Sequence, residues 1–315
     1  MTSSGSSAVE GATEIKAQRR LDAMSNWGRW GENDQAGAAN TVDAAAVARG
    51  VAAIRTHRVV SLGAEIGARS APRIPAQPSP RHFMEIWDPP PPGAPADAHP
   101  FAVDTTLIAT HGTTTHVDAL CHVWVGDQLY NGFDRHRVGH AGAAVLGMEQ
   151  MPAIVTRGVL LDVASLRGVD HLADDTVVTA EDLAACADAA QVELQPGDAV
   201  LVRTGWPRMW AEDRRRYQRT QPGVGASAGL YLAERDVCLV GADNSGVQPK
   251  LPPGVYNAPR HDLHIPLLRN LGIYLLEMLD LEQLAVAGAS TFFFCLAPLR
   301  ISGGTGSPVN PTAVL

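Results

Sequence analysis

The stretch "THVDALCHVWVGDQLYNG", residues 115–132, brings His116, Asp118 and His122 within seven positions. Side chains alternate along a β-strand, so His116 and Asp118 would point to one face of a strand here. His122 lies beyond the "ALC" segment, where a bend could return it to the same place. Imidazole and carboxylate together suit zinc or manganese. Polar groups that are merely hydrogen-bonded at the end of a buried strand explain the spacing equally well, so both interpretations stay open.

Further candidate ligands lie on either side of this stretch. His111 precedes His116 by five residues, and a regular strand would point it to the opposite face unless a bulge intervenes. Downstream, His264 comes before the apolar run 272–276, which ends at Glu277. A carboxylate in such surroundings is costly unless it is paired or binds a metal. Glu277 could also face solvent at the end of the strand, and the residues alone do not decide.

The rest of the chain alternates between strand and helix patterns. Apolar runs predict strands, and apolar residues at helical spacing predict helices. A near capping box of Thr179 and Asp182 marks the start of one helix. This alternation predicts one compact α/β domain with a mixed central sheet. The expected strands are 57–67, 158–164, 197–206, 237–244 and 290–301, the expected helices are 42–56, 179–190 and 229–236, and residues 266–285 begin as a helix and continue into the strand-like "GIYLLE".

Three segments lack such patterns. Residues 1–20 are dominated by Ser, Gly and Ala and predict a flexible N-terminal tail, which leaves 21–315 as the domain. Residues 25–42 hold Trp27 and Trp30 among glycines and predict irregular structure. Residues 70–100 carry many prolines and predict a long loop without a regular element.

Composition narrows the function classes. The 315 residues carry a formal net charge of −8 without a Lys/Arg block, which argues against a nucleic-acid partner. No apolar run reaches the roughly 18 residues of a membrane span, and no secretory signal is readable. The four cysteines are scattered, as in a protein of the reducing cytoplasm. We therefore expect a cytoplasmic protein that acts on a small molecule, with no membrane or nucleic-acid partner.

An ordered series of segments resembles the longer members of the metal-dependent cyclase-like hydrolase family, which includes bacterial kynurenine formamidase and isatin hydrolase. The resemblance runs from about residue 26 to the C-terminus and implies a compact α/β domain with a barrel-like central sheet flanked by helices, of the swivelling β/β/α type. The segments that carry it are "NWGRWG", "GTTTHVDALCH", "LYNG", "RGVLLDV", "PGDAVLVRTGW", "GADNSGVQP", "HIPLLRNLGIYLLEMLDLEQLA" and "APLRISGGTGSPVNP".

The resemblance also assigns roles to residues. It implies that one divalent ion, Zn²⁺ or Mn²⁺, is bound by His116, Asp118, His264 and Glu277. It gives His122 the role of proton donor and acceptor, and it points to Trp30 or Trp27 as a substrate-binding residue. The first histidine of the family motif is replaced here by Gly112, which favours one metal ion over two. Family members commonly form dimers or tetramers, so a homo-oligomer is expected.

The implied activity is hydrolysis of a small amide, lactam, lactone or ester. A bound Zn²⁺ or Mn²⁺ brings the pKa of water to around 7, and the activated water attacks the carbonyl. His122 would pass the proton to the leaving group. Two alternatives stay open: a metal-dependent cyclase of an aromatic polyketide-type substrate, and a non-catalytic metal-binding protein.

Overall fold

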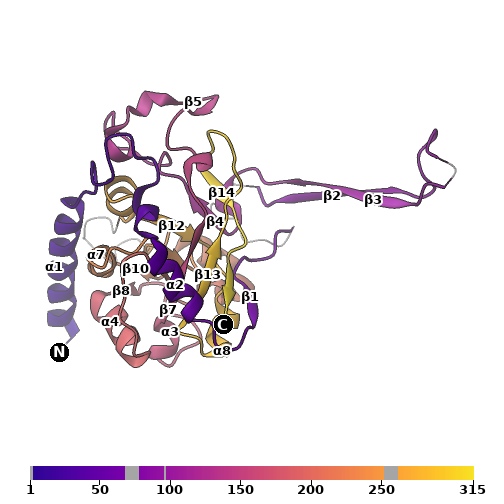
Figure 1. The fold of residues 1–315 in the computed structure, drawn as a ribbon. Coiled ribbons are helices and arrows are strands. Elements are labelled where there is room, and N and C mark those ends of the chain that lie inside the picture. Colours follow the sequence, from indigo (N-terminus) through magenta and orange to yellow (C-terminus); the bar gives the residue numbers. More distant parts are fainter. Residues whose placement is uncertain (1–2, 68–77, 96, 252–261) are drawn as a thin grey trace.

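A curled, nine-stranded mixed sheet forms the centre of the molecule (Figure 1). The computed structural model describes residues 3–67, 78–95, 97–251 and 262–315. In spatial order the strands are β1 (Val59–Ser61), β15 (Thr312–Val314), β13 (Thr291–Leu296), β7 (Ile154–Asp162), β9 (Ala199–Arg203), β11 (Leu239–Ala242), β12 (Tyr274–Glu277), β4 (His116–Asp118) and β14 (Gly306–Pro308).

The middle of this sheet is parallel and its two sides are antiparallel. Strand β9 pairs in parallel with both β7 and β11, and β11 pairs in parallel with β12. Every residue of β9, β11 and β12 is buried. Strands buried on both faces need continuous apolar runs, which is why these segments could be predicted from the sequence. The predicted mixed, barrel-like sheet flanked by helices is confirmed.

Helices cover the sheet and complete the core. Helix α2 packs against β7 and β13, while α4 packs against β7 and α7. The capping box at Thr179 and Asp182 begins α4, as predicted. The helices are α1 (Ser3–Asp22), α2 (Ala44–Ala52), α3 (Val163–Leu166), α4 (Ala180–Ala189), α5 (Met209–Glu212), α6 (Arg214–Arg219), α7 (Ala226–Ala233), α8 (Glu282–Ala287) and the π-helix η7 (His264–Asn270).

Short elements fill the connections between these strands and helices. They are the two-stranded pairs β8 (Val177–Val178) with β10 (Gly223–Val224) and β5 (Val138–Gly139) with β6 (Gly142–Ala143), and the 3₁₀ turns η1 (Gly37–Thr41), η2 (His111–Thr113), η3 (Tyr130–Gly132), η4 (Arg135–Arg137), η5 (Met148–Gln150) and η6 (Trp206–Arg208). No helix in the described part of the chain is both long and apolar enough to cross a membrane.

Helix α1 occupies most of the range for which the sequence predicted a flexible tail, residues 1–20. It packs along α7. Ala17 and Leu21 are buried, and the Glu14 carboxylate accepts a hydrogen bond from the backbone N–H of Ser227 at 3.2 Å. The tail prediction therefore needs correction from Ser3 onward. Composition suggested a tail because small residues dominate, but a few buried side chains suffice to dock the helix.

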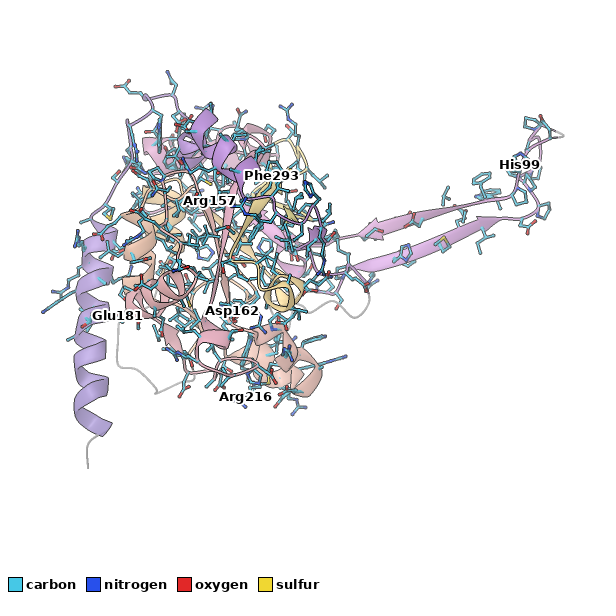
Figure 2. The ribbon with its side chains drawn as sticks, turned by 60° about the horizontal axis from the view of Figure 1, so that its bottom comes forward. His99, Arg157, Asp162, Glu181, Arg216 and Phe293 are labelled. Atoms are coloured by element: carbon cyan, nitrogen blue, oxygen red, sulfur yellow. The ribbon has the colours of Figure 1, made fainter. Side chains whose placement is uncertain are left out.

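The expectation of an irregular loop over residues 70–100 is also wrong in part. Strands β2 (Arg81–Trp87) and β3 (Phe101–Leu107) form a hairpin that projects far from the body (Figure 1). Figure 2 shows its side chains standing clear of the body, with His99 at the far end. Prolines 89–92, 95 and 100 lie between the two strands, outside the β2–β3 ladder. Residues 68–77 lie outside the described residues.

Candidate metal centre

Strand β4 brings the first two candidate ligands into the core. It lies between β12 and β14, and His116 pairs directly with Glu277 of β12. Residues directly opposite each other on neighbouring strands share a face, and so do residues two apart on one strand. His116, Asp118 and Glu277 therefore point the same way, and all three are fully buried. The donor atoms of these three side chains all lie within 4.8 Å of one another.

His264 is the fourth side chain of the group and lies near Asp118 and Glu277. It is the first residue of η7, and its Nε2 lies 3.6 Å from Oδ2 of Asp118 and 3.4 Å from Oε1 of Glu277. Nε2 of His116 lies 3.7 Å from Oδ1 of Asp118 and 3.3 Å from Oε2 of Glu277. The structure thus brings together all four residues that the family resemblance implies as ligands.

These separations match those between ligands that share one ion. Two ligands that each lie about 2.1 Å from a zinc ion at tetrahedral angles are about 3.4 Å apart. The four nitrogen–oxygen separations of 3.3–3.7 Å agree with that value and exceed the usual length of a hydrogen bond. Two carboxylates and two neutral imidazoles carry a charge of −2, which a divalent cation would neutralise.

The hydrogen bonds around the site leave the site-facing donor atoms of His116 and Asp118 available. Among the residues that the structure describes, no group hydrogen-bonds to Nε2 of His116 or to either carboxylate oxygen of Asp118. Buried polar atoms without such partners are costly, and a bound cation would satisfy these three. Nδ1 of His116 donates to the Thr114 carbonyl at 2.8 Å, and Nδ1 of His264 lies 3.2 Å from the side-chain oxygen of Gln248. Both contacts hold Nε2 as the nitrogen that faces the site. The donor set therefore fits a metal ion.

The protonation of these groups reflects their mutual charge. Burial disfavours charge on His116, but the Glu277 and Asp118 carboxylates outweigh it and raise the pKa of His116 above its ordinary value. Burial alone would raise the pKa of Asp118, yet the surrounding histidines, His122 first among them, bring this pKa below its usual range. Asp118 is therefore an anion held among imidazoles.

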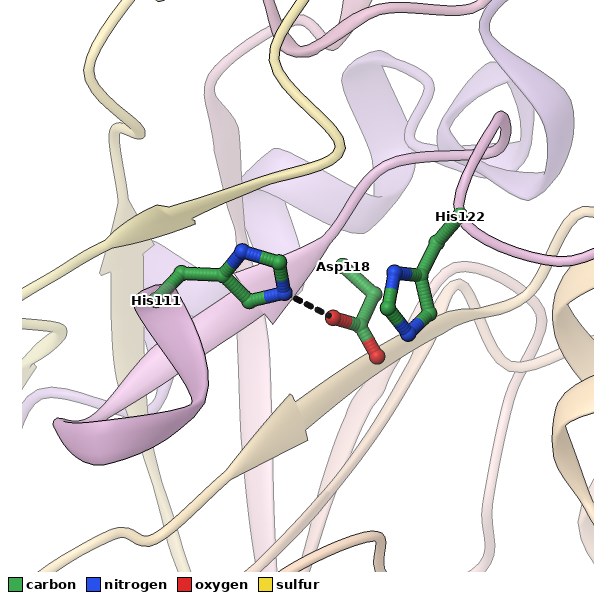
Figure 3. Close-up of side chains that lie close together, drawn as sticks. All are labelled: His111, Asp118 and His122. Atoms are coloured by element: carbon green, nitrogen blue, oxygen red, sulfur yellow. Dashed lines mark ion pairs between the residues drawn. The ribbon is translucent and has the colours of Figure 1, made fainter. Parts of the chain in front are cut away.

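Two more histidines flank Asp118 from opposite sides (Figure 3). Nε2 of His111 lies 3.4 Å from Oδ1 of Asp118. His111, Asp118 and His122 form a second group with donor atoms within 4.8 Å, so Asp118 belongs to both groups. The rings of His111 and His122 have centroids 5.4 Å apart.

Strand alternation predicted that His111 points away from His116, but the structure places His111 beside Asp118. It begins the 3₁₀ turn η2, and Thr114 then continues in extended conformation into β4. This turn, rather than a bulge within a strand, carries the His111 ring to the same side as His116, at a centroid distance of 5.1 Å. The "HGT" triplet at 111–113 gave the only sequence signal, because glycine favours a departure from the strand.

His122 reaches the site through the bend that the sequence suggested. Its backbone N–H donates to the Ala119 carbonyl at 2.9 Å, which turns the chain directly after Asp118. Burial lowers the pKa of His122, and the neighbouring His111 and His264 rings add to the effect against the opposing charge of Asp118. The neutral imidazole is thus the favoured form at pH 7, and it can accept a proton.

The two tryptophans suggested for substrate binding both contact arginine residues. Trp27 donates from Nε1 to the Arg269 carbonyl at 3.1 Å, and the Arg269 guanidinium lies 4.3 Å from its ring centroid. Trp30 lies under the Arg29 guanidinium at 4.7 Å. Arg269 follows His264 by five residues in η7. A role for Trp27 or Trp30 in substrate binding stays a prediction. If His122 proved to be a metal ligand, the sequence would offer His261 or His111 for the acid–base role. His261 lies outside the described residues.

Comparisons with known proteins agree with this fold. A family model named Cyclase matches residues 38–249. A crystal structure described as a novel cyclase is similar with a TM-score of 0.82 and 32% sequence identity, covering 93% of this chain and 100% of that one. A search of curated proteins found no match.

More distant structures share the fold alone. An isatin hydrolase bound to the product analogue thioisatinate has a TM-score of 0.59 and 21% identity, over 82% of this chain and 92% of that chain. Isatin hydrolase A from Labrenzia aggregata, bound to benzyl benzoate, has a TM-score of 0.57 and 24% identity, over 84% and 94%.

Proposed function

The chain belongs to the cyclase family, and on that premise we propose that it is a metal-dependent hydrolase of a small amide, lactam, lactone or ester. The observation that carries the proposal is the closed ring of His116, Asp118, His264 and Glu277, with nitrogen–oxygen separations of 3.3–3.7 Å. The isatin hydrolases with the same fold support the lactam end of this substrate range.

The four side chains of the ring would hold one divalent ion, Zn²⁺ or Mn²⁺. Such an ion supplies a Lewis acid that polarises a carbonyl and lowers the pKa of water. Asp118 and Glu277 supply the negative charge that retains the ion, and the hydrogen bonds to Nδ1 orient the two imidazoles. Asp118 also belongs to the second group, with His111 and His122. We assign the single ion to the set with four donors.

His122 would move the proton. The imidazole of His122 lies beside Asp118 (Figure 3). His122 is not one of the four proposed ligands, and its ring centroid lies 6.1 Å from that of His264. From there the neutral imidazole can accept a proton from attacking water and return it to the leaving nitrogen or oxygen. His111 lies on the other side of Asp118, with its Nε2 3.4 Å from Oδ1 of Asp118.

The experiment is hydrolysis in ¹⁸O-labelled water over a panel of formanilides, isatins and aromatic lactones. We expect one ¹⁸O atom in the carboxylate product, activity lost on chelation, and activity restored by Zn²⁺ or Mn²⁺. Failure of every panel member with a protein that carries its full metal content would contradict a hydrolase of this substrate range.

Ring closure is the second candidate, favoured by the structure at 32% identity that is described as a cyclase. There the same ion would polarise a ketone of an aromatic polyketide-type substrate, and His122 would remove a proton from carbon. Such a product would carry no ¹⁸O from water at a carboxylate and would gain a new chromophore. The labelling experiment therefore separates the two activities.

A further inference from the structure

A cavity of about 580 Å³ adjoins the metal centre, yet none of the four proposed ligands lines it. Small-molecule sites typically enclose roughly 300–1,000 Å³. The volume is therefore that of a site for a small ligand. We call it the acidic cavity, and its wall includes Trp210, Tyr217, Asp243, Met278, Asp280 and Glu282.

The acidic cavity lies where parallel strands of the central sheet end. Asp243 directly follows β11, and Met278 directly follows β12. In open α/β sheets, ligands bind in the crevice outside the carboxyl ends of the strands. Glu277, the last residue of β12, serves the metal centre at this same edge. The position in the sheet thus suits a second ligand site.

Backbone that supports the metal centre also forms part of the cavity wall. Thr114 and Thr115 line the cavity. The Thr114 carbonyl accepts the hydrogen bond from Nδ1 of His116 at 2.8 Å. The Thr115 hydroxyl donates to the Met278 carbonyl at 2.6 Å, and Met278 directly follows Glu277. A ligand in the cavity therefore contacts segments that position two proposed metal ligands, without lying among the four ligands themselves.

Aromatic and aliphatic side chains form the apolar part of the wall. The rings of Trp210 and Tyr217 meet edge to face with centroids 5.4 Å apart. Tyr217 is buried, and the Arg214 guanidinium lies 4.7 Å from the ring centroid of Trp210. Met278 and Leu279 add aliphatic surface. Such a wall binds the apolar body of a ligand.

The only basic side chain that lines the cavity, among the described residues, is already paired. It is Arg208, which contacts Glu282 at 2.6 Å. Arg203 approaches the same carboxylate at 2.8 Å and also pairs with Asp162 at 3.0 Å. The charge of Glu282 is therefore compensated, and the charge that the cavity offers to a ligand comes from its other carboxylates.

Asp243 and Asp280 supply that negative charge. The buried Asp243 carboxylate accepts hydrogen bonds from Thr204 and from the Gly205 N–H at 2.7 Å. Oδ1 of Asp280 accepts the Glu282 N–H at 3.2 Å. In the part of the chain that the structure describes, no basic side chain forms an ion pair with either carboxylate. Charges in such a partly enclosed site attract an opposite charge more strongly than charges in water do.

We propose that the acidic cavity is a second ligand site, which takes a small organic cation with an ammonium group on an aromatic or branched aliphatic body. The ammonium group pairs with Asp243 and Asp280, and the body packs against Trp210 and Tyr217. In the described residues, both groups of side chains spaced to hold a metal ion lie outside this wall, so the occupant is not a bare ion. The proposal does not depend on the hydrolase activity.

Two probes of equal shape test the preference for positive charge. Phenethylamine and 2-phenylethanol are titrated into the full chain as purified, at pH 7.5, by isothermal titration calorimetry. Phenethylamine should bind at least about tenfold more tightly, because only its ammonium group gains from the carboxylates. Equal affinities of the two probes would overturn the proposal.

Variants locate the binding in the acidic cavity. Asp280→Asn keeps the oxygen that accepts the Glu282 N–H, and it should weaken phenethylamine at least about fivefold while leaving 2-phenylethanol unchanged. Trp210→Leu should weaken both probes. Asp188→Asn, an exposed change on α4, is the matched control and should change neither. Undiminished phenethylamine binding in folded Asp280→Asn would overturn the proposal. So would binding that is lost in Asp118→Ala but kept in Asp280→Asn, because the probe would then lie at the metal centre.

Discussion

Asp118 is the residue on which the candidate site converges. Its two oxygens face His116 and His111 on one side and His264 on the other, at 3.4–3.7 Å. It belongs to both groups of donors, so a change at this residue affects every other member. Residues that share one ion or one hydrogen-bond network are not independent, so the effects of substituting them will not be additive.

At His122 we predict a loss of turnover without a loss of metal. His122→Ala should fold, retain its ion and lose roughly 10²–10⁴-fold in turnover, the usual contribution of a positioned acid–base group. His122→Gln should be equally poor, because an amide does not exchange a proton at pH 7. Substrates with better leaving groups should lose less. The exposed His136→Ala is the control.

Metal analysis of the same variants decides the role of His122. If His122→Ala loses metal in step with activity, His122 is a ligand of an ion bound with His111 and Asp118, and the proton-transfer role passes to another residue.

Gln248 is predicted to position His264. Its side-chain oxygen lies 3.2 Å from Nδ1 of His264 and accepts the Leu263 N–H at 2.8 Å. Loss of such an outer contact typically weakens metal binding by about 10–100-fold. Gln248→Ala should do so, as measured by competition with a chromophoric chelator, while Gln248→Glu should retain most of the affinity. Equal affinity in wild type and Gln248→Ala would refute a positioning role.

At the element scale, local and tertiary preferences agree for the long buried strands, so sequence patterns placed β7, β9, β11, β12 and β13 together with helices α2, α4 and α7. Helix α4 carries its own start signal, and β9 and β11 need apolar side chains on both faces. The β2–β3 hairpin was not predicted because the prolines at its tip dominated the composition of residues 70–100. The position of His111 at the site was not predicted, because side chains alternate only within a strand and η2 interrupts the strand before β4.

The capping box of α4 gives the prediction at this scale. The Thr179 hydroxyl accepts the Asp182 N–H, and the Asp182 carboxylate accepts the Thr179 N–H at 2.9 Å. Thr179→Ala should cost about 1 kcal/mol of unfolding free energy, or about 2 °C in Tm for a chain of this size. Thr179→Ser keeps the hydroxyl and should match the wild type in calorimetry. An unchanged Tm in Thr179→Ala would show that the cap contributes nothing here.

At the scale of the whole molecule, the sheet joins distant segments into one site. Strands β4, β12 and β14 meet at one edge although about 190 residues separate the first from the last. No local pattern predicts which strands become neighbours, so the proximity of His116 to Glu277 could come only from the family resemblance. Their convergence with His264 depends on the tertiary arrangement.

The pH dependence of stability is predicted from Asp243, which lies in the core. Burial raises the pKa of Asp243 to about 6, despite hydrogen bonds from Thr204 and Gly205 that lower it. The folded chain therefore holds this proton more tightly than the unfolded chain does. The resulting stabilisation is present below about pH 4 and is lost as pH rises through about 6, on the order of 3 kcal/mol.

Asp243→Asn removes this titration. The Tm of the wild type minus that of the variant should therefore fall between pH 4.5 and pH 7.5 in scanning calorimetry. A difference that grows with pH would mean that Asp243 is ionised more readily in the folded chain than in the unfolded one.

The central claim, that the ring of four donors holds one divalent ion, is tested most directly by elemental analysis of the purified chain and its Asp118→Ala variant. Our account predicts about one Zn²⁺ or Mn²⁺ per wild-type chain and almost none in Asp118→Ala, while the exposed Asp127→Ala stays at the wild-type level. Wild-type metal content in folded Asp118→Ala would contradict it, and two ions per wild-type chain would contradict the single-ion assignment.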